Sequence, residues 1–199
     1  MERQGLINLV KIKLDELTPT GVALPFDDYI GPMLDESAIE LLEKGPIHLL
    51  APTVLVILGI LYAEEKAFIP VPTDFIRLHE IKFPLWKKSV YKAISIENPD
   101  YKIQENEYLV GGYGRPSVTI KSTSTTGVAF NKYLVCSKVL PSATPLPATY
   151  IKKAKPEDLP DLLTESITWL CASKILHIGG KGNEAKLAYE QFANSLIQT

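Results

Sequence analysis

The residues best suited to chemistry in this sequence are three histidines and two cysteines, and their spacing argues against an active site. His48, His79 and His177 form no His-Glu-x-x-His pair, and Cys136 and Cys171 form no Cys-x-x-Cys pair. Zinc sites and metalloproteases use such short spacings to bring ligands together on one element. A serine nucleophile elbow, Gly-x-Ser-x-Gly, is also missing from the sequence. We therefore predict no catalytic residue, no metal and no cofactor, and we expect that the protein is not an enzyme.

Two glycine clusters resemble nucleotide-binding loops only superficially. Gly179-Gly180-Lys181-Gly182 has Ile175 where a phosphate loop needs its first glycine, and Gly182 where it needs serine or threonine. The segment also follows an expected helix, whereas the motif follows a strand. We interpret it as a turn between two helices. Gly111-Gly112-Tyr113-Gly114 lacks the strand–turn–helix context of a dinucleotide site and is expected to be a loop.

Composition and charge are those of an ordinary globular protein. The chain has 199 residues, 46% of them hydrophobic and 22% charged, which suits one domain or one domain with an inserted subdomain. Its 21 basic and 23 acidic residues give a formal charge of −2. No basic excess indicates nucleic-acid binding, although a near-neutral surface is compatible with a channel through which DNA passes.

The sequence suggests no membrane association. The longest apolar run, 49–62, contains Pro52 and Gly59 and is too short for a spanning helix. Cys136 and Cys171 are expected to be buried, reduced thiols because nothing indicates a secretory context. We expect synthesis in a cytoplasm.

One stretch in the middle of the chain organises the elements around it. Its prolines restrict the backbone to extended conformations, and Asp74 can close the turn that precedes a strand over 75–81. Alternation places Ile76 and Leu78 on one side of that strand, with Arg77 and His79 on the other. After Pro84 stops the strand, Trp86 supplies a large amphipathic anchor and a candidate interface residue. The full stretch is Ala67-Phe-Ile-Pro-Val-Pro-Thr-Asp-Phe-Ile-Arg-Leu-His-Glu-Ile-Lys-Phe-Pro-Leu-Trp86.

Helices are expected at both ends of the chain. Residues 1–17 carry an apolar stripe widened on both sides, which suggests contact with two neighbours, one of them from another chain. A loop over 22–32 is expected before a second helix over 36–44. The C-terminal helices begin near Pro156 and at Glu184.

Strands are expected between these helices. Residues 54–69 are predicted to form a hairpin, 117–120 and 128–139 two further strands, and 99–113 a loop. The polar segment 121–127 is predicted to project as an exposed hairpin tip that touches a neighbouring subunit or another partner protein. Its candidate interface residues are Lys121, Thr123 and Thr125.

Three aromatic residues in the C-terminal helices are further interface candidates. Trp169 lies off the main stripe of its helix, which suits either a partly buried core residue or a subunit contact. Tyr189 and Phe192 are the largest members of the last apolar stripe. That stripe either packs on the chain's own stripe over 159–170, or its end docks on a partner, with Gly179-Gly180 as the swivel.

Together these patterns predict an α+β protein: a helical bundle with an inserted antiparallel β-subdomain. The expected divisions are 1–52 for the first bundle helices, 53–154 for the β-rich subdomain and 155–199 for the completing helices.

The organising stretch resembles head-to-tail connector proteins of tailed bacteriophages, most closely the ring proteins of crAss-like phages. The resemblance covers about Asp35 to Gln191. It rests on Ile69-Pro-Val-Pro-Thr-Asp-Phe-Ile-Arg-Leu78, Trp86, 90–94, Asn98-Pro-Asp-Tyr-Lys-Ile-Gln104 and Gly111-Gly112.

The resemblance implies a structural virion protein with the fold of phage head-completion adaptors. Such subunits form a homo-oligomeric ring, twelve-fold in that family, between the portal and the tail or a second ring protein. The ring extends the channel for packaged DNA, which passes without sequence-specific binding. We then expect synthesis in the host bacterial cytoplasm and residence at the portal vertex of the virion.

Two other function classes remain open on the sequence. The β-rich middle suits a small glycan- or oligonucleotide-binding module, for which exposed aromatics should follow one strand face. The tyrosines at 91, 101, 108, 113 and 133 fall mostly in expected loops instead. A small enzyme with an unrecognised site is disfavoured because nucleophile and base are not paired.

Overall fold

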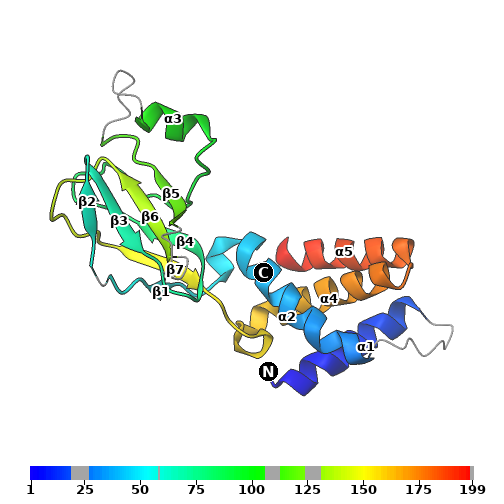
Figure 1. Ribbon diagram of the computed structural model, residues 1–199. Coiled ribbons are helices and arrows are strands. Elements are labelled where there is room, and N and C mark those ends of the chain that lie inside the picture. Colours follow the sequence, from blue (N-terminus) through cyan, green and yellow to red (C-terminus); the bar gives the residue numbers. More distant parts are fainter. Residues whose placement is uncertain (19–26, 58, 106–112, 124–130, 198–199) are drawn as a thin grey trace. The chain divides into compact units, whose positions relative to one another are not determined.

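A computed structural model shows an α+β protein that divides into two compact units (Figure 1). The structure describes residues 1–18, 27–57, 59–105, 113–123 and 131–197. The helical unit comprises Met1–Ala51 and Lys153–Thr199, and the β unit comprises Pro52–Lys152. The α+β class expected from the sequence is confirmed, with antiparallel pairing throughout both sheets.

The helical unit is built around one central helix. Its elements are α1 (Arg3–Leu17), α2 (Asp27–Lys44), η1 (Ile47–Leu49), η2 (Pro156–Asp158), η3 (Asp161–Leu163), α4 (Thr164–Ile178) and α5 (Gly182–Ile197). Helices α1, α2 and α5 all pack on α4 (Figure 1). Ten of the fifteen residues of α4 are buried, because three helices cover it. The two ends of the chain therefore contribute to one core.

Small side chains let α5 approach α4 closely. Ala185 and Ala188 are the buried residues of α5. Ser173 Oγ donates a hydrogen bond to the carbonyl oxygen of Ala185 over 2.8 Å, and the hydroxyls of Ser166 and Ser195 lie 2.8 Å apart. These bonds satisfy polar groups inside a tight helix–helix contact. The turn expected at Gly179-Gly180 is present, and Gly180 has a φ of +72° that favours glycine.

The second helix begins earlier than the sequence predicts. Residues 27–32 belong to α2, although they were expected to be loop, and Pro32 lies inside the helix. Proline lacks one backbone donor and crowds the preceding turn, and Pro32 lies beyond the first turn of α2, so it removes one helical hydrogen bond; the residue itself is exposed. Packing of Ile30 and Leu34, which are 1% and 0% exposed, outweighs that local penalty.

The β unit contains two antiparallel sheets. Its strands are β1 (Thr53–Val54), β2 (Leu61–Ala63), β3 (Lys66–Pro70), β4 (Phe75–Ile81), β5 (Val118–Thr123), β6 (Asn131–Ser137) and β7 (Ala148–Lys152). One sheet has the order β1-β7-β4 and the other β2-β3-β6-β5. The two sheets share one apolar core, to which both strand sets and the segment around Trp86 contribute.

The hairpin expected over 54–69 is shorter and placed differently. It comprises β2 and β3, whereas β1 ends at Val54 and pairs with β7 in the other sheet. The hairpin turns at Glu64 and Glu65, whose φ angles of 51° and 57° are left-handed. The apolar run 54–58, rich in β-branched residues, predicted one strand continuing to Leu61, because propensity does not reveal which sheet a residue joins.

Strand β4 has the bounds expected from the sequence, 75–81, but the alternation of buried and exposed side chains along it is interrupted. Leu78 and Ile81 are both buried although three positions separate them. The β4–β7 register shifts between Phe75 and Arg77 and again between Leu78 and Glu80. Each irregularity changes which side chains face the core. Strict period-two assignment of Ile76 and Leu78 to one face was therefore too simple.

A short helix, α3 (Pro99–Glu105), occupies part of the expected loop over 99–113. Asn98 Oδ1 accepts a hydrogen bond from the backbone N–H of Asp100 over 2.9 Å, as an N-cap residue does. The pair Asn98-Pro99 carried that signal in the sequence, since proline is favoured at the first helical position.

Candidate interaction surfaces

Neither cysteine is in an environment that makes its thiol reactive. Cys136 is wholly buried in the β core, and burial raises the pKa of its thiol far above the usual range. Burial raises the pKa of the Cys171 thiol to about 12. The reactive form of cysteine is the thiolate, so both groups remain protonated and inert near neutral pH. Their expected role as buried thiols agrees with this environment.

The described histidines do not gather with other ligand-type residues. His48 and His177 are exposed on the helical unit, and His79 Nδ1 lies 3.0 Å from Thr149 Oγ1 in the β unit. Within the described ranges, no group of three or more His, Cys, Asp or Glu side chains is placed to hold a metal ion.

Both tryptophans lie in cores. Trp86 is 2% exposed and packs edge-to-face on Phe83, with ring centroids 5.1 Å apart. Its Nε1–H donates to the carbonyl oxygen of Lys138 over 2.9 Å. Trp169 is 8% exposed, so of the two roles expected for it, core residue or subunit contact, it has the first within this chain. Little of either side chain is accessible to a partner.

Charged residues surround Trp169. Lys13 Nζ lies 3.8 Å from the centroid of the Trp169 ring and 3.7 Å from Glu165 Oε1. Trp169 Nε1 also donates to Glu165 Oε1 over 3.4 Å. The lysine from α1 is therefore held over the indole face, which is a favourable cation–π geometry. The off-stripe position of Trp169 is explained by contact with α1.

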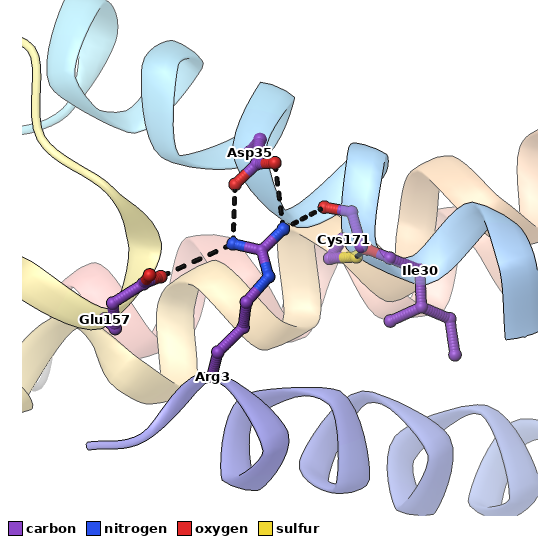
Figure 2. Close-up of polar contacts among 6 residues, drawn as sticks. Arg3, Ile30, Asp35, Glu157 and Cys171 are labelled. Carbon is purple, nitrogen blue, oxygen red and sulfur yellow. Dashed lines mark hydrogen bonds and ion pairs between the residues drawn. The ribbon is translucent and has the colours of Figure 1, made fainter.

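An arginine at the chain start joins three elements of the helical unit (Figure 2). Its two terminal nitrogens, Nη1 and Nη2, bind the Asp35 carboxylate at 2.8 and 2.9 Å. Arg3 also donates to the Gly31 carbonyl oxygen at 3.2 Å and to Glu157 Oε2 at 3.4 Å. Hydrogen bonding to Arg3 lowers the pKa of the Asp35 carboxyl below its usual range. These contacts fasten α1 and η2 to α2, which makes them structural.

A groove lies on the helical unit where α2, α4 and α5 meet. It has a volume of about 500 Å³, and its apolar lining includes Met33, Ile178 and Ala185. Lys174 lies at one side, where its ammonium binds Glu36 at 2.9 Å and Glu40 at 2.8 Å. Those ion pairs hold α4 to α2 and fix that wall of the groove.

Tyr189 is the sequence-predicted residue that the structure brings to this groove. It is 53% exposed, and its ring centroid lies 5.4 Å from that of Phe192. Phe192 is half-buried, so α5 packs internally through its small residues and turns Tyr189 outward. Ile178, which is 59% exposed, was not singled out from the sequence. Its position in the last turn of α4 could have suggested an outward apolar residue.

The predicted hairpin tip falls largely outside the described residues. Lys121 and Thr123 belong to β5, and Thr123 pairs with Asn131. Thr125 lies outside the described ranges. Lys121 Nζ lies 5.2 Å from the centroid of the Tyr101 ring on α3. That contact connects the edge strand β5 to α3.

A smaller cleft in the β unit has basic walls. It has a volume of about 250 Å³ and lies between segment 88–94, α3 and the start of β5. Its charged lining residues are Lys88, Lys92, Arg115 and Asp100. Lys88 and Arg115 lie far apart along the chain and become neighbours only after folding, so no local pattern in the sequence indicates this cleft.

Comparison with known proteins provides no relative for this chain: no protein-family model matches it, and no curated protein is significantly similar to it. Among the helices that the structure describes, none is both long enough and apolar enough to cross a membrane.

Proposed function

We propose that this protein is a structural subunit of the head-to-tail connector of a tailed bacteriophage. In this proposal, identical copies form a ring beneath the portal, and the ring joins the portal to the tail and surrounds the passing DNA. It catalyses no reaction. Its place of action is the portal vertex of the virion.

The observation that supports the proposal most is the division of the chain. Both ends of the sequence build one helical unit, and Pro52–Lys152 form a separate β unit inserted between them. This is the order that the resemblance to connector proteins implies. The motif residues 69–78 and Trp86 lie within the inserted unit, where they form β3, β4 and part of the core.

The outer side of α5 is the surface that we assign to the portal. Tyr189 is 53% exposed on this helix, and Ile197 near its end is 81% exposed on the same side. The apolar groove beside Tyr189 extends the same surface to Ile178 and Met33. Gathered exposed apolar residues commonly mark protein–protein contacts, and tyrosine is enriched among residues that dominate binding.

A ring also requires two different surfaces on each subunit, because head-to-tail contacts are heterologous. Helix α1 presents Ile12, which is 52% exposed, on the side away from its buried residues Leu6, Val10 and Leu14. This agrees with the proposal that α1 contacts a second chain as well as its own core.

The test is binding to the purified cognate portal, followed by electron microscopy of the complex. We expect a ring of this protein on the portal. Tyr189→Ser should weaken portal binding about 30-fold, the effect of losing about 2 kcal/mol at an aromatic interface residue, with an unchanged melting temperature. Gln191→Ser is the matched control, because Gln191 is exposed on the same helix.

Two results would count against the proposal in different ways. A wild-type protein that remains monomeric and does not bind the portal would overturn the connector function. A wild-type ring that forms normally, with equal portal affinity for both serine variants, would retain the function and remove α5 from the portal interface.

A further inference from the structure

Charge is divided unevenly between the two units. The β unit, 52–152, has 12 lysines and arginines and 8 aspartates and glutamates, a formal charge of +4. The residues of the helical unit have 9 and 15, a formal charge of −6. The overall charge of −2 conceals this separation. A basic unit within an acidic protein is a reason to look for an anionic ligand.

The basic cleft provides a specific place for such a ligand. Lys88 and Lys92 come from the segment after β4, and Arg115 comes from the turn before β5. All three side chains are exposed. Among the described residues that line the cleft, three are basic and one, Asp100, is acidic. Lys121 adds a further cation beside Tyr101 on α3.

Backbone hydrogen bonds hold the cleft walls in place. The Lys87 N–H donates to the carbonyl oxygen of Tyr113 over 3.1 Å, and the Ile94 N–H donates to that of Val118 over 2.8 Å. Val90 exchanges hydrogen bonds of 2.9 Å with Ile81 of β4. The backbone that carries Lys88 and Lys92 is therefore tied at three points to its neighbours. Cations presented on a fixed frame need less ordering when a ligand binds.

The size of the cleft limits what part of a ligand can enter. Pockets for drug-sized molecules and cofactors occupy about 300–1,000 Å³, whereas this cleft is about 250 Å³. It suits one anionic group of a larger molecule that continues outside. Lysine and arginine are the usual partners of phosphate oxygens, arginine with paired donors and lysine as a point charge.

We propose that this cleft binds the phosphodiester backbone of nucleic acid. The inference rests on the proposed connector function for the source of the phosphate, which is the passing DNA duplex. Contacts to phosphates carry no sequence information, so binding is independent of sequence and depends strongly on salt. A few phosphate contacts per subunit give weak affinity, and a ring would repeat them around the DNA.

The test measures binding of the full-length protein to a fluorescent DNA duplex by anisotropy over a salt series. Each neutralised phosphate contributes about −0.9 to the slope of log affinity against log salt. Lys88→Ala/Lys92→Ala removes the lysines that hold the phosphate in the cleft and should therefore make the slope shallower by about 0.9. Between about 50 and 200 mM salt, the wild-type affinity should fall about 3.5-fold more than that of the double variant. Inorganic phosphate as competitor distinguishes a site for free phosphate from one for the backbone.

The matched control is Lys132→Ala/Lys152→Ala, which removes two exposed lysines of the same unit outside the cleft lining. It should change the slope much less. If both double variants change the slope equally, the cleft is not the binding site, and the DNA is attracted only by the net charge of the unit. Displacement of the duplex by millimolar phosphate would overturn backbone binding in favour of a free anion.

The same variants also test a second possible occupant of the cleft, the acidic helical unit of another copy, when their self-association is measured. If the cleft variant binds DNA normally but self-associates more weakly, the cleft accepts the acidic helical unit of another copy, and the nucleic-acid proposal is wrong. Portal binding, measured on the same variants, keeps this result distinct from the connector function. If the cleft variant loses DNA binding but still binds the portal, the cleft is the DNA-binding site and the proposed connector function is unaffected.

Discussion

At the scale of single residues, the two tryptophans differ in how their indole N–H groups are satisfied. Trp86 donates to a backbone carbonyl within the β core, whereas Trp169 donates over a longer distance to an exposed carboxylate. Water can replace a partner at an exposed carboxylate but cannot easily reach a carbonyl beneath a buried ring. The energetic consequence of losing each bond should therefore differ.

Replacing each tryptophan by phenylalanine tests this difference. Trp86→Phe removes a part-buried hydrogen bond to the Lys138 carbonyl oxygen and should cost about 1–3 kcal/mol, besides the effect of the space left by the smaller ring. Trp169→Phe keeps an aromatic ring beneath Lys13 and should cost less. Urea unfolding followed by circular dichroism measures both. Equal losses would contradict the importance of the Trp86 hydrogen bond.

The Arg3–Asp35 pair predicts a dependence of stability on pH. Because the folded pKa of Asp35 is lowered, the stabilising contribution is complete above the unfolded pKa of about 4. It is lost as the pH falls through the lower, folded value. Both side chains are partly exposed, at 37% and 52%, so the contribution is below about 1 kcal/mol after solvent screening.

Arg3→Met should therefore reduce stability at pH 6 and reduce it less at pH 2. The measurement is the urea midpoint at each pH, compared with Lys186→Met, which removes one exposed charge from the same helical unit. A pH-independent loss for Arg3→Met would indicate that its alkyl packing, and not the ion pair, holds α1 in place.

At the scale of elements, α5 separates an inward face of small residues from an outward face of large ones. Ala188 is wholly buried against α4, and its neighbour Leu187 is half exposed. A sequence stripe drawn through all apolar positions does not distinguish these roles. Close packing against α4 leaves no room for a larger side chain at the inward positions.

Ala188→Leu should destabilise the helical unit by about 1–3 kcal/mol because the added carbons overpack the α4 contact. Leu187→Ala should change stability by less than about 0.5 kcal/mol, as is usual on a surface. Thermal unfolding measures both variants. If the larger effect comes from Leu187→Ala, the faces of α5 are assigned the wrong way round.

At the scale of the whole molecule, the β unit has the features of an independently folding domain. Its core comprises residues between Leu55 and Tyr150 and includes contributions from both sheets. Domains with their own core usually fold alone. The helical unit differs, because its elements come from both ends of the chain.

An excised fragment of residues 52–152 should unfold cooperatively and give dispersed amide signals by nuclear magnetic resonance. Trp86→Ala in the same fragment is the control, since removing a buried tryptophan costs about 3–5 kcal/mol and should unfold much of the population. A fragment that lacks cooperative unfolding would show that the β unit needs the helical unit to fold.

Several features followed from the sequence alone because they depend on neighbours along the chain. Apolar periodicity located α1 and α5, and prolines bounded β4. The helix expected to begin near Pro156 begins only at Thr164, because η2 and η3 occupy the first part of that stretch. The sequence contains no closely spaced histidine or cysteine pair, and on that basis it predicts no metal site. Local patterns carry this information since backbone preferences act over a few residues.

Other features were decided by tertiary structure. Pro32 is accommodated within α2 because Ile30 and Leu34 bury their side chains. Val54 and Leu61 belong to different sheets although one apolar run connects them. Lys88 and Arg115 line one cleft only because β bridges bring distant segments together. In each case the free energy comes from contacts between residues far apart in the chain, and a local pattern cannot report them.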